Sequence, residues 1–129
     1  SYTDMSDSRF TFTKNYIIIK QDVCATNPTK IGMSNKDGWA GYVRNNHLFV
    51  KICPFKEGIY PDKGSSFESF TNQDMLELET MSPLVELRSD EIAEHTEDWY
   101  LFDEVRIENN DTCINKEILT KVKTIKKGE

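Results

Sequence analysis

Acidic side chains alternate with leucines in one short segment of the chain. If Met75-Leu76-Glu77-Leu78-Glu79-Thr80 forms a strand, Glu77 and Glu79 lie on one face and the two leucines lie on the other. The two carboxylates are then about 6–7 Å apart, because each strand residue advances the chain by about 3.3 Å. The pattern predicts a pair of carboxylates on one face of a sheet.

The preceding segment adds a carboxylate and an aromatic ring to this face. Residues 66–71 form another candidate strand, in which Glu68 and Phe70 share a face. Antiparallel pairing across the short connection 72–74 places them beside the Glu77–Glu79 pair.

Carboxylates beside aromatic rings suit a sugar, since carboxylates accept hydrogen bonds from hydroxyls and rings pack against C–H faces. A partly buried carboxylate also suits a general base. The alternative is that these glutamates form the solvated face of an antiparallel sheet.

Histidines and cysteines give weaker signals. His95 is expected on the same strand face as Glu97 and Trp99, which leaves open a contact with a ligand or a solvated sheet face. His47 begins a strand beside a turn, so we expect it at the surface. No histidine or cysteine has a second ligand at metal spacing, and we predict neither a metal site nor a cofactor. The three cysteines are expected to be free thiols.

The elements that position these residues are mostly strands. Alternating or β-branched segments are separated by Asn, Asp, Ser, Gly and Pro, with very little helical periodicity between them. The Asn45-Asn46 pair predicts a tight turn that joins two of the strands in a hairpin. The candidate strands cover residues 9–13, 16–20, 39–44, 47–54, 66–71, 75–81, 84–88 and 92–105. This spacing predicts an all-β, antiparallel β-sandwich.

The periodicity changes near the C-terminus. Five apolar residues from Ile114 to Ile125 fall at helical spacing, which predicts an amphipathic helix over about 113–126 with Asp111 or Thr112 as its N-cap. Its lysines gather toward the end, where positive charge suits the helix dipole. We expect a solvated helix face packed on the sandwich, the alternative being a surface for membranes or nucleic acid.

Composition excludes several classes of protein. The chain has 129 residues and a net charge of −6, which is one domain of acidic character. Twelve acidic residues between Ser66 and Glu104 face a single cation, Arg88. A general nucleic-acid binder needs a basic face, and a transmembrane helix needs a long apolar run, so we predict neither kind of partner.

Several segments together resemble a known superfamily. The stretch 75–80, followed by 84–91 and 95–102, resembles the C-terminal part of the galactose mutarotase (aldose 1-epimerase) superfamily, where an L-E-T strand precedes an L-x-P-G-E turn and a closing strand. The turn is altered here to Ser89-Asp90-Glu91. The whole chain resembles the second half of an uncharacterised bacterial family of that superfamily. The segments that carry this closer resemblance are 1–4, 30–32, 38–43, 48–51 and 67–79.

The resemblance implies roles for particular residues. In that superfamily the Glu of the L-E-T strand removes the proton of the anomeric hydroxyl and a His protonates the ring oxygen. The first role falls on Glu79, whereas the His has no counterpart in the matched segments. Glu68, Trp39 and Lys51 become further candidates for ligand contact, the alternative for the last two being core or sheet surface.

The resemblance also bears on the extent of the domain. It implies that residues 1–129 form a single mutarotase-like domain, either as a fragment or shortened form of a supersandwich, or as a fold that only binds its ligand.

Three hypotheses follow. The first is a carbohydrate-binding protein that holds its ligand with carboxylates on a sheet face. The second is an aldose-epimerase-like enzyme with Glu79 as general base. The third is a structural or interaction module that completes its sheet by forming a homodimer, because exposed sheet edges favour pairing.

Overall fold

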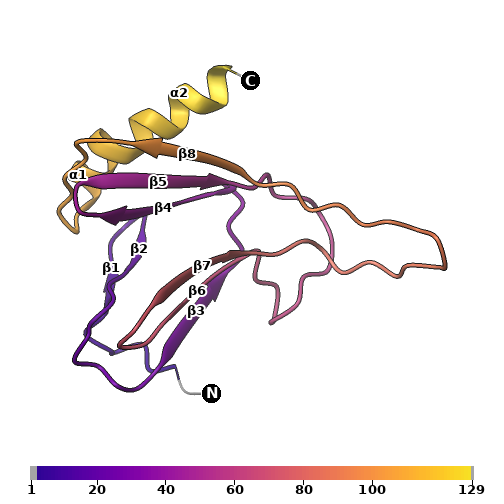
Figure 1. The fold of residues 1–129 in the computed structure, drawn as a ribbon, viewed down its shortest axis with the longest axis horizontal. Helices are drawn as coiled ribbons and strands as arrows, with labels where there is room; N and C mark the ends of the chain where they lie inside the picture. The colour runs from indigo at the N-terminus through magenta and orange to yellow at the C-terminus, as the bar shows by residue number, and fades with distance from the viewer. Residues whose placement is uncertain (1–2, 129) are drawn as a thin grey trace.

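The computed structural model describes residues 3–128 and confirms the all-β fold class with one C-terminal helix. Three antiparallel sheets are formed by eight strands (Figure 1). The strands are β1 (Phe10–Phe12), β2 (Ile17–Ile19), β3 (Thr29–Met33), β4 (Trp39–Arg44), β5 (His47–Ile52), β6 (Phe67–Thr71), β7 (Leu76–Thr80) and β8 (Asp98–Phe102). They pair in the orders β1-β2, β3-β6-β7 and β4-β5-β8.

The β3-β6-β7 and β4-β5-β8 sheets form the two halves of a sandwich-like arrangement, with β1 and β2 between them at one end (Figure 1). The predicted hairpin is confirmed, since β4 pairs with β5 and both turn residues, Asn45 and Asn46, have positive φ. Asparagine tolerates this backbone conformation, which a two-residue hairpin turn requires.

The main core lies on one side of the β4-β5-β8 sheet. Leu48, Val50 and Ile52 of β5 point to this side and are at most 2% exposed. Ile114, Ile118 and Val122 of the helix pack against them, as does Val105. Alternate apolar residues of a strand and every fourth residue of a helix therefore meet in one layer.

The helix is continuous from Asp111 to Gly128 and contains three stretches. These are α1 (Asp111–Ile114), a π-helical stretch over Asn115–Leu119, and α2 (Thr120–Gly128). It begins two residues before the expected start at about residue 113, because the side chain of Asn110 accepts a hydrogen bond from Cys113 N at 2.9 Å and acts as the N-cap. The prediction of Asp111 or Thr112 as N-cap was wrong.

Two strand predictions were also wrong. Residues 84–88 form no strand, and the predicted long strand 92–105 is confined to β8. The residues between β7 and β8 are extended, but they lie beside no neighbouring strand (Figure 1). Periodicity predicts an extended backbone and says nothing about whether a partner is present.

The sequence analysis missed β3, where Gly32 lowers the strand propensity. The glycine is required there because a Cβ would lie 2.4 Å from Ser65 Oγ and 3.0 Å from Glu68 Oε1. The close approach of β3 to Ser65 and Glu68 thus explains why a glycine, which lowers strand propensity, occurs in this strand.

Candidate functional site

The predicted glutamates share one face of the β3-β6-β7 sheet. β6 and β7 pair antiparallel, with Glu68 opposite Glu79 and Phe70 opposite Glu77. This register confirms the predicted pairing. Like charges directly opposite each other in a sheet are destabilising, so a cation is needed nearby.

Lys30 of β3 supplies that cation. Its ammonium pairs with Glu68 Oε2 and lies 3.0 Å from Glu79 Oε2. Hydrogen bonds to Glu68 and Glu79 outweigh burial and raise the pKa of Lys30 well above its usual range, so the side chain stays charged. Glu68 is 5% exposed, whereas the side chain of Glu79 is partly exposed. The sequence analysis did not predict this cluster, although alternation in β3 places Lys30 and Gly32 on the same face.

Lys51 and His95, which were predicted separately, lie together between the two sheets. We call this group the cleft site, a name that refers only to its position between the two sheets: Lys51, Thr80, His95, Glu97 and Trp99. Lys51 Nζ lies 3.2 Å from Glu97 Oε1 and donates a hydrogen bond to Leu78 O at 2.8 Å. Thr80 also donates to Glu97, and His95 Nε2 lies 2.8 Å from Thr80 Oγ1. The cluster joins β7 of one sheet to β5 and β8 of the other.

Glu97 is the centre of the cleft site. Burial raises the pKa of its carboxyl, but hydrogen bonds from Thr80, Trp99 and Lys51 outweigh burial, and the net pKa is lowered. The carboxylate is therefore ionised at neutral pH. Its charge holds Lys51, Thr80 and Trp99 in place.

Trp99 presents its ring to solvent while its nitrogen is bound. Nε1 donates to Glu97 Oε2 at 2.9 Å, and Phe49 packs edge-on with ring centroids 5.5 Å apart. Lys51 Nζ lies 5.7 Å from the ring centroid. Although it has these contacts, the residue is 66% exposed. The cleft site thus contains a large ring that is both positioned and accessible.

Cys53 and His95 lie near each other, but their geometry does not fit a nucleophilic relay. Cys53 Sγ and Glu97 Oε1 are both 3.9 Å from the same nitrogen, His95 Nε2. A Cys-His-Glu relay uses the two ring nitrogens for its two partners. Burial also raises the pKa of the Cys53 thiol, which keeps it protonated.

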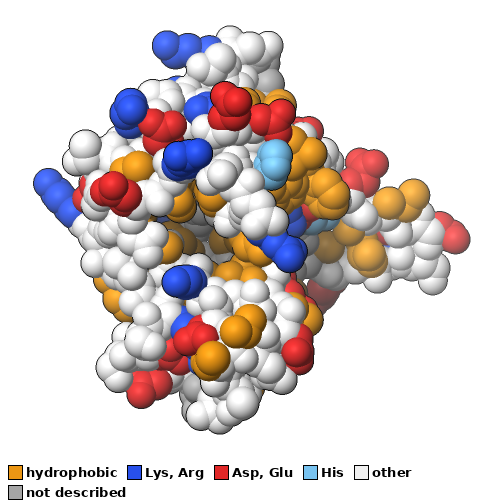
Figure 2. Space-filling view, turned by 60° about the vertical axis from the view of Figure 1, so that its left-hand side comes forward, with side chains coloured by type: hydrophobic (Ala, Val, Ile, Leu, Met, Phe, Trp, Pro, Cys, Tyr) orange, Lys and Arg blue, Asp and Glu red, His pale blue; other side chains and the backbone are white. Residues whose placement is uncertain are grey.

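Trp39 belongs neither to the Lys30 cluster nor to the cleft site, but it lines the same cavity as Glu68. Its ring packs edge-on against Tyr16, with centroids 6.2 Å apart, and contacts the main core. It also lines a cavity of about 230 Å³ between the sheets, whose mouth Figure 2 shows as a hollow with hydrophobic side chains inside. Most of the lining is aliphatic or aromatic, for example Ile31, Met33, Leu76, Leu78 and Ile118. The hydroxyl of Ser69 in this lining already donates to Glu77 O. The lining also includes the polar residues Asn35, Asp37 and Glu68. Glu68 is already paired with Lys30.

Residues 3–128 contain no group of three or more His, Cys, Asp or Glu side chains arranged to hold a metal ion. Within the same residues, no helix is both long enough and apolar enough to cross a membrane.

Comparison of the chain with protein-family models, curated proteins and solved structures gives no significant match. Function is therefore inferred from the geometry of the sites.

Proposed function

We propose that this protein binds a carbohydrate or a sugar-like polyol at the cleft site. The observation that carries the proposal is the exposed ring of Trp99, fixed by Glu97, Phe49 and Lys51. Aromatic rings pack well against the C–H faces of sugars, and a ring already held in place loses little entropy on binding.

Polar groups beside the ring keep unused hydrogen-bonding capacity. A carboxylate accepts about four hydrogen bonds. Glu97 accepts from Thr80, Trp99 and Lys51, so one acceptor position remains. The Lys51 ammonium has three donors and directs two of them at Leu78 O and Glu97. One acceptor and one donor side by side suit two neighbouring hydroxyls of a sugar ring.

His95 adds a third polar group. Among the described residues, its contacts with Thr80, Glu97 and Cys53 all use Nε2. Nδ1 therefore remains for a ligand.

Catalysis by Glu79 is less well supported by the geometry than binding. The Lys30–Glu79 ion pair must break before the carboxylate accepts a proton. Lys30 is a poor proton donor because its pKa is raised. Of the described histidines, His47 contacts Asp103 and His95 belongs to the cleft site. The structure thus brings no histidine to the Lys30 cluster to act as the acid of an aldose epimerase.

A titration followed by NMR tests the proposal. A panel of methyl glycosides should shift the Trp99 indole N–H and the His95 ring resonances, with a Kd in the millimolar range that is common for single sugars. Trp99→Ala should weaken binding about 5- to 10-fold, the value expected for loss of one stacking contact. Leu101→Ala is the matched control, since Leu101 is exposed and two residues further along β8.

Two results would contradict the proposal: no shift at the cleft site with any glycoside, or equal loss of binding in both variants. Anomer exchange measured in the same samples tests the epimerase hypothesis separately. Catalysed exchange that Glu79→Gln abolishes would support it.

A further inference from the structure

An arm of extended chain projects from the molecule between β7 and β8. We define the arm as residues 82–97; in Figure 1 it leaves the end of both sheets and points away from α2. Its apolar residues Leu84, Val85, Leu87 and Ile92 are between 53% and 85% exposed. Contiguous exposed apolar residues of this kind mark interaction surfaces.

The backbone of the arm is also largely unpaired. Among the described residues, its backbone-to-backbone hydrogen bonds are Leu84 N to Ile59 O at the base and Glu91 N to Arg88 O at the tip. The remaining extended stretch offers its N–H and C=O groups to a neighbouring strand. Unpaired extended backbone is a template for adding a strand to another sheet.

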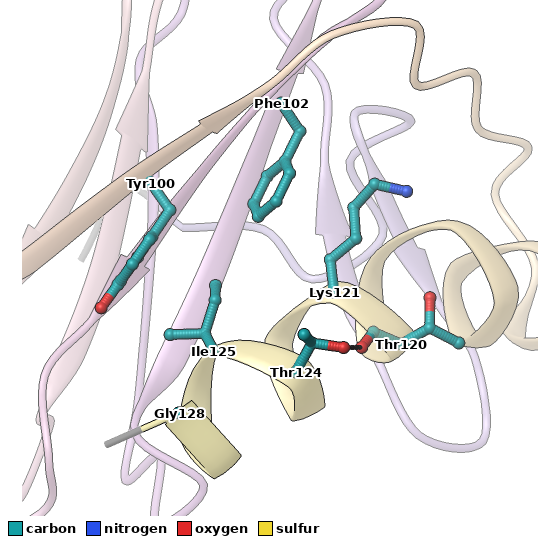
Figure 3. Close-up of a pocket in the computed structure, with 7 residues that line it drawn as sticks. All are labelled: Tyr100, Phe102, Thr120, Lys121, Thr124, Ile125 and Gly128. Atoms are coloured by element: carbon teal, nitrogen blue, oxygen red, sulfur yellow. Dashed lines mark hydrogen bonds between the residues drawn. The ribbon is translucent and has the colours of Figure 1, made fainter.

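A groove with complementary properties lies between β8 and α2. It has a volume of about 500 Å³, and Tyr100, Phe102 and Ile125 form its apolar floor (Figure 3). Lys121 lies at its side, with Nζ 6.0 Å from the centroid of the Phe102 ring. β8 is the last strand of the β4-β5-β8 sheet, so one edge of this strand has no strand beside it in the described chain.

The charges of arm and groove are opposite. The arm carries Glu86, Asp90, Glu91, Glu94 and Glu97, with Arg88 as its only cation. The α2 helix carries Lys121, Lys123, Lys126 and Lys127 and no acidic residue. The arm points away from the α2 helix of its own chain, and no arm residue lines the groove, so the acidic arm is free to meet the groove of a second molecule (Figure 1).

We propose that the arm of one copy docks along β8 of a second copy, and that the second copy docks its arm on the first. Val85 and Leu87 alternate to the same side of an extended chain and enter the groove, against Tyr100, Phe102 and Ile125. The acidic side chains of the arm lie near the lysines of α2. Reciprocal exchange makes a closed two-fold dimer and buries both arms.

Sedimentation equilibrium of the full chain over a range of concentrations tests the dimer. The wild type should associate to the mass of two chains. Its association should weaken when salt rises from about 0.05 M to about 0.5 M, because the Debye length shortens and the attraction between the acidic arm and the lysines is screened. Val85→Ser/Leu87→Ser should raise the dimer Kd about 100-fold or more, through lost apolar burial. Val23→Ser is the matched control, since Val23 is exposed and lies outside both arm and groove.

A mixing experiment tests the reciprocal contact. Thr124→Glu blocks the groove by placing a carboxylate at an exposed lining position, and should also give monomers. Mixing this variant with Val85→Ser/Leu87→Ser should restore association, since one intact arm meets one intact groove.

Three results would overturn the proposal. They are a wild type that is monomeric at every concentration and salt, a Val23→Ser control that weakens association equally, and a mixture that stays monomeric. A mass above that of two chains would overturn the two-fold arrangement.

Discussion

Removing the cation of the Lys30–Glu68–Glu79 cluster should destabilise the protein. Lys30→Met keeps most of the side-chain volume and deletes the charge. Glu68, which is 5% exposed, is then left without a cation, and the residue opposite it on the paired strand is Glu79. Loss of one partner of a buried ion pair costs about 3–5 kcal/mol. Since Lys30 and Glu79 are partly exposed, we expect the lower value, about 3 kcal/mol, in the free energy of unfolding.

Urea unfolding followed by circular dichroism measures this cost. Lys20→Met, which removes an exposed lysine, is the control and should change stability by less than about 0.5 kcal/mol. Lys30→Met/Glu68→Gln should recover at least half of the loss, because the buried uncompensated charge is gone. A loss below about 1 kcal/mol, or a double variant as unstable as the single one, would refute the reasoning.

The pH dependence supplies a further check on this cluster. A lysine with a raised folded pKa stabilises fully below its unfolded pKa of about 10.4, and this contribution is lost as pH rises through the folded pKa. The pKa of Lys30 is raised in the folded protein. The difference in the free energy of unfolding between wild type and Lys30→Met should therefore be constant from about pH 6 to 9. It should decrease only at strongly alkaline pH.

Three further predictions concern single residues. Glu97→Gln should cost about 1–2 kcal/mol at pH 7, and urea unfolding should show the difference shrinking as pH falls below about 4.3, because the folded pKa of Glu97 is lowered; a difference independent of pH would contradict this. Thr29→Val should stabilise by about 1 kcal/mol, since the buried hydroxyl has no partner among the described residues; a loss measured by urea unfolding would count against it. A thiol reagent should modify exposed Cys24 quickly and buried Cys53 only after unfolding, and equal rates would contradict the structure.

The sequence predicted most of the strands because their side chains alternate cleanly. It also placed Glu68, Glu77 and Glu79 on one face, since the connection 72–74 is too short for any pairing other than a hairpin. Two-residue periodicity therefore determined both the sheet and its acidic face.

What the sequence did not predict depends on contacts between distant segments. Lys30 meets Glu68 across 38 positions only because β3 pairs with β6. The cleft site needs Thr80, at the end of β7, to lie against Glu97, which directly precedes β8 of the other sheet. His95 and Glu97 reach that site from an irregular segment, where strand alternation gives no information on side-chain direction.

The one-sided core has a consequence for how the molecule opens. Seven buried residues hold the helix on β4-β5-β8, whereas β3-β6-β7 is joined to that half through a few polar side chains such as Lys51 and Ser66. Segments with fewer apolar contacts unfold locally at lower free energy. Native-state hydrogen exchange should therefore show two cooperative units, with β5 amides in the slower one. Removing Lys30 should accelerate exchange in β3, β6 and β7 and leave the protection of β5 unchanged.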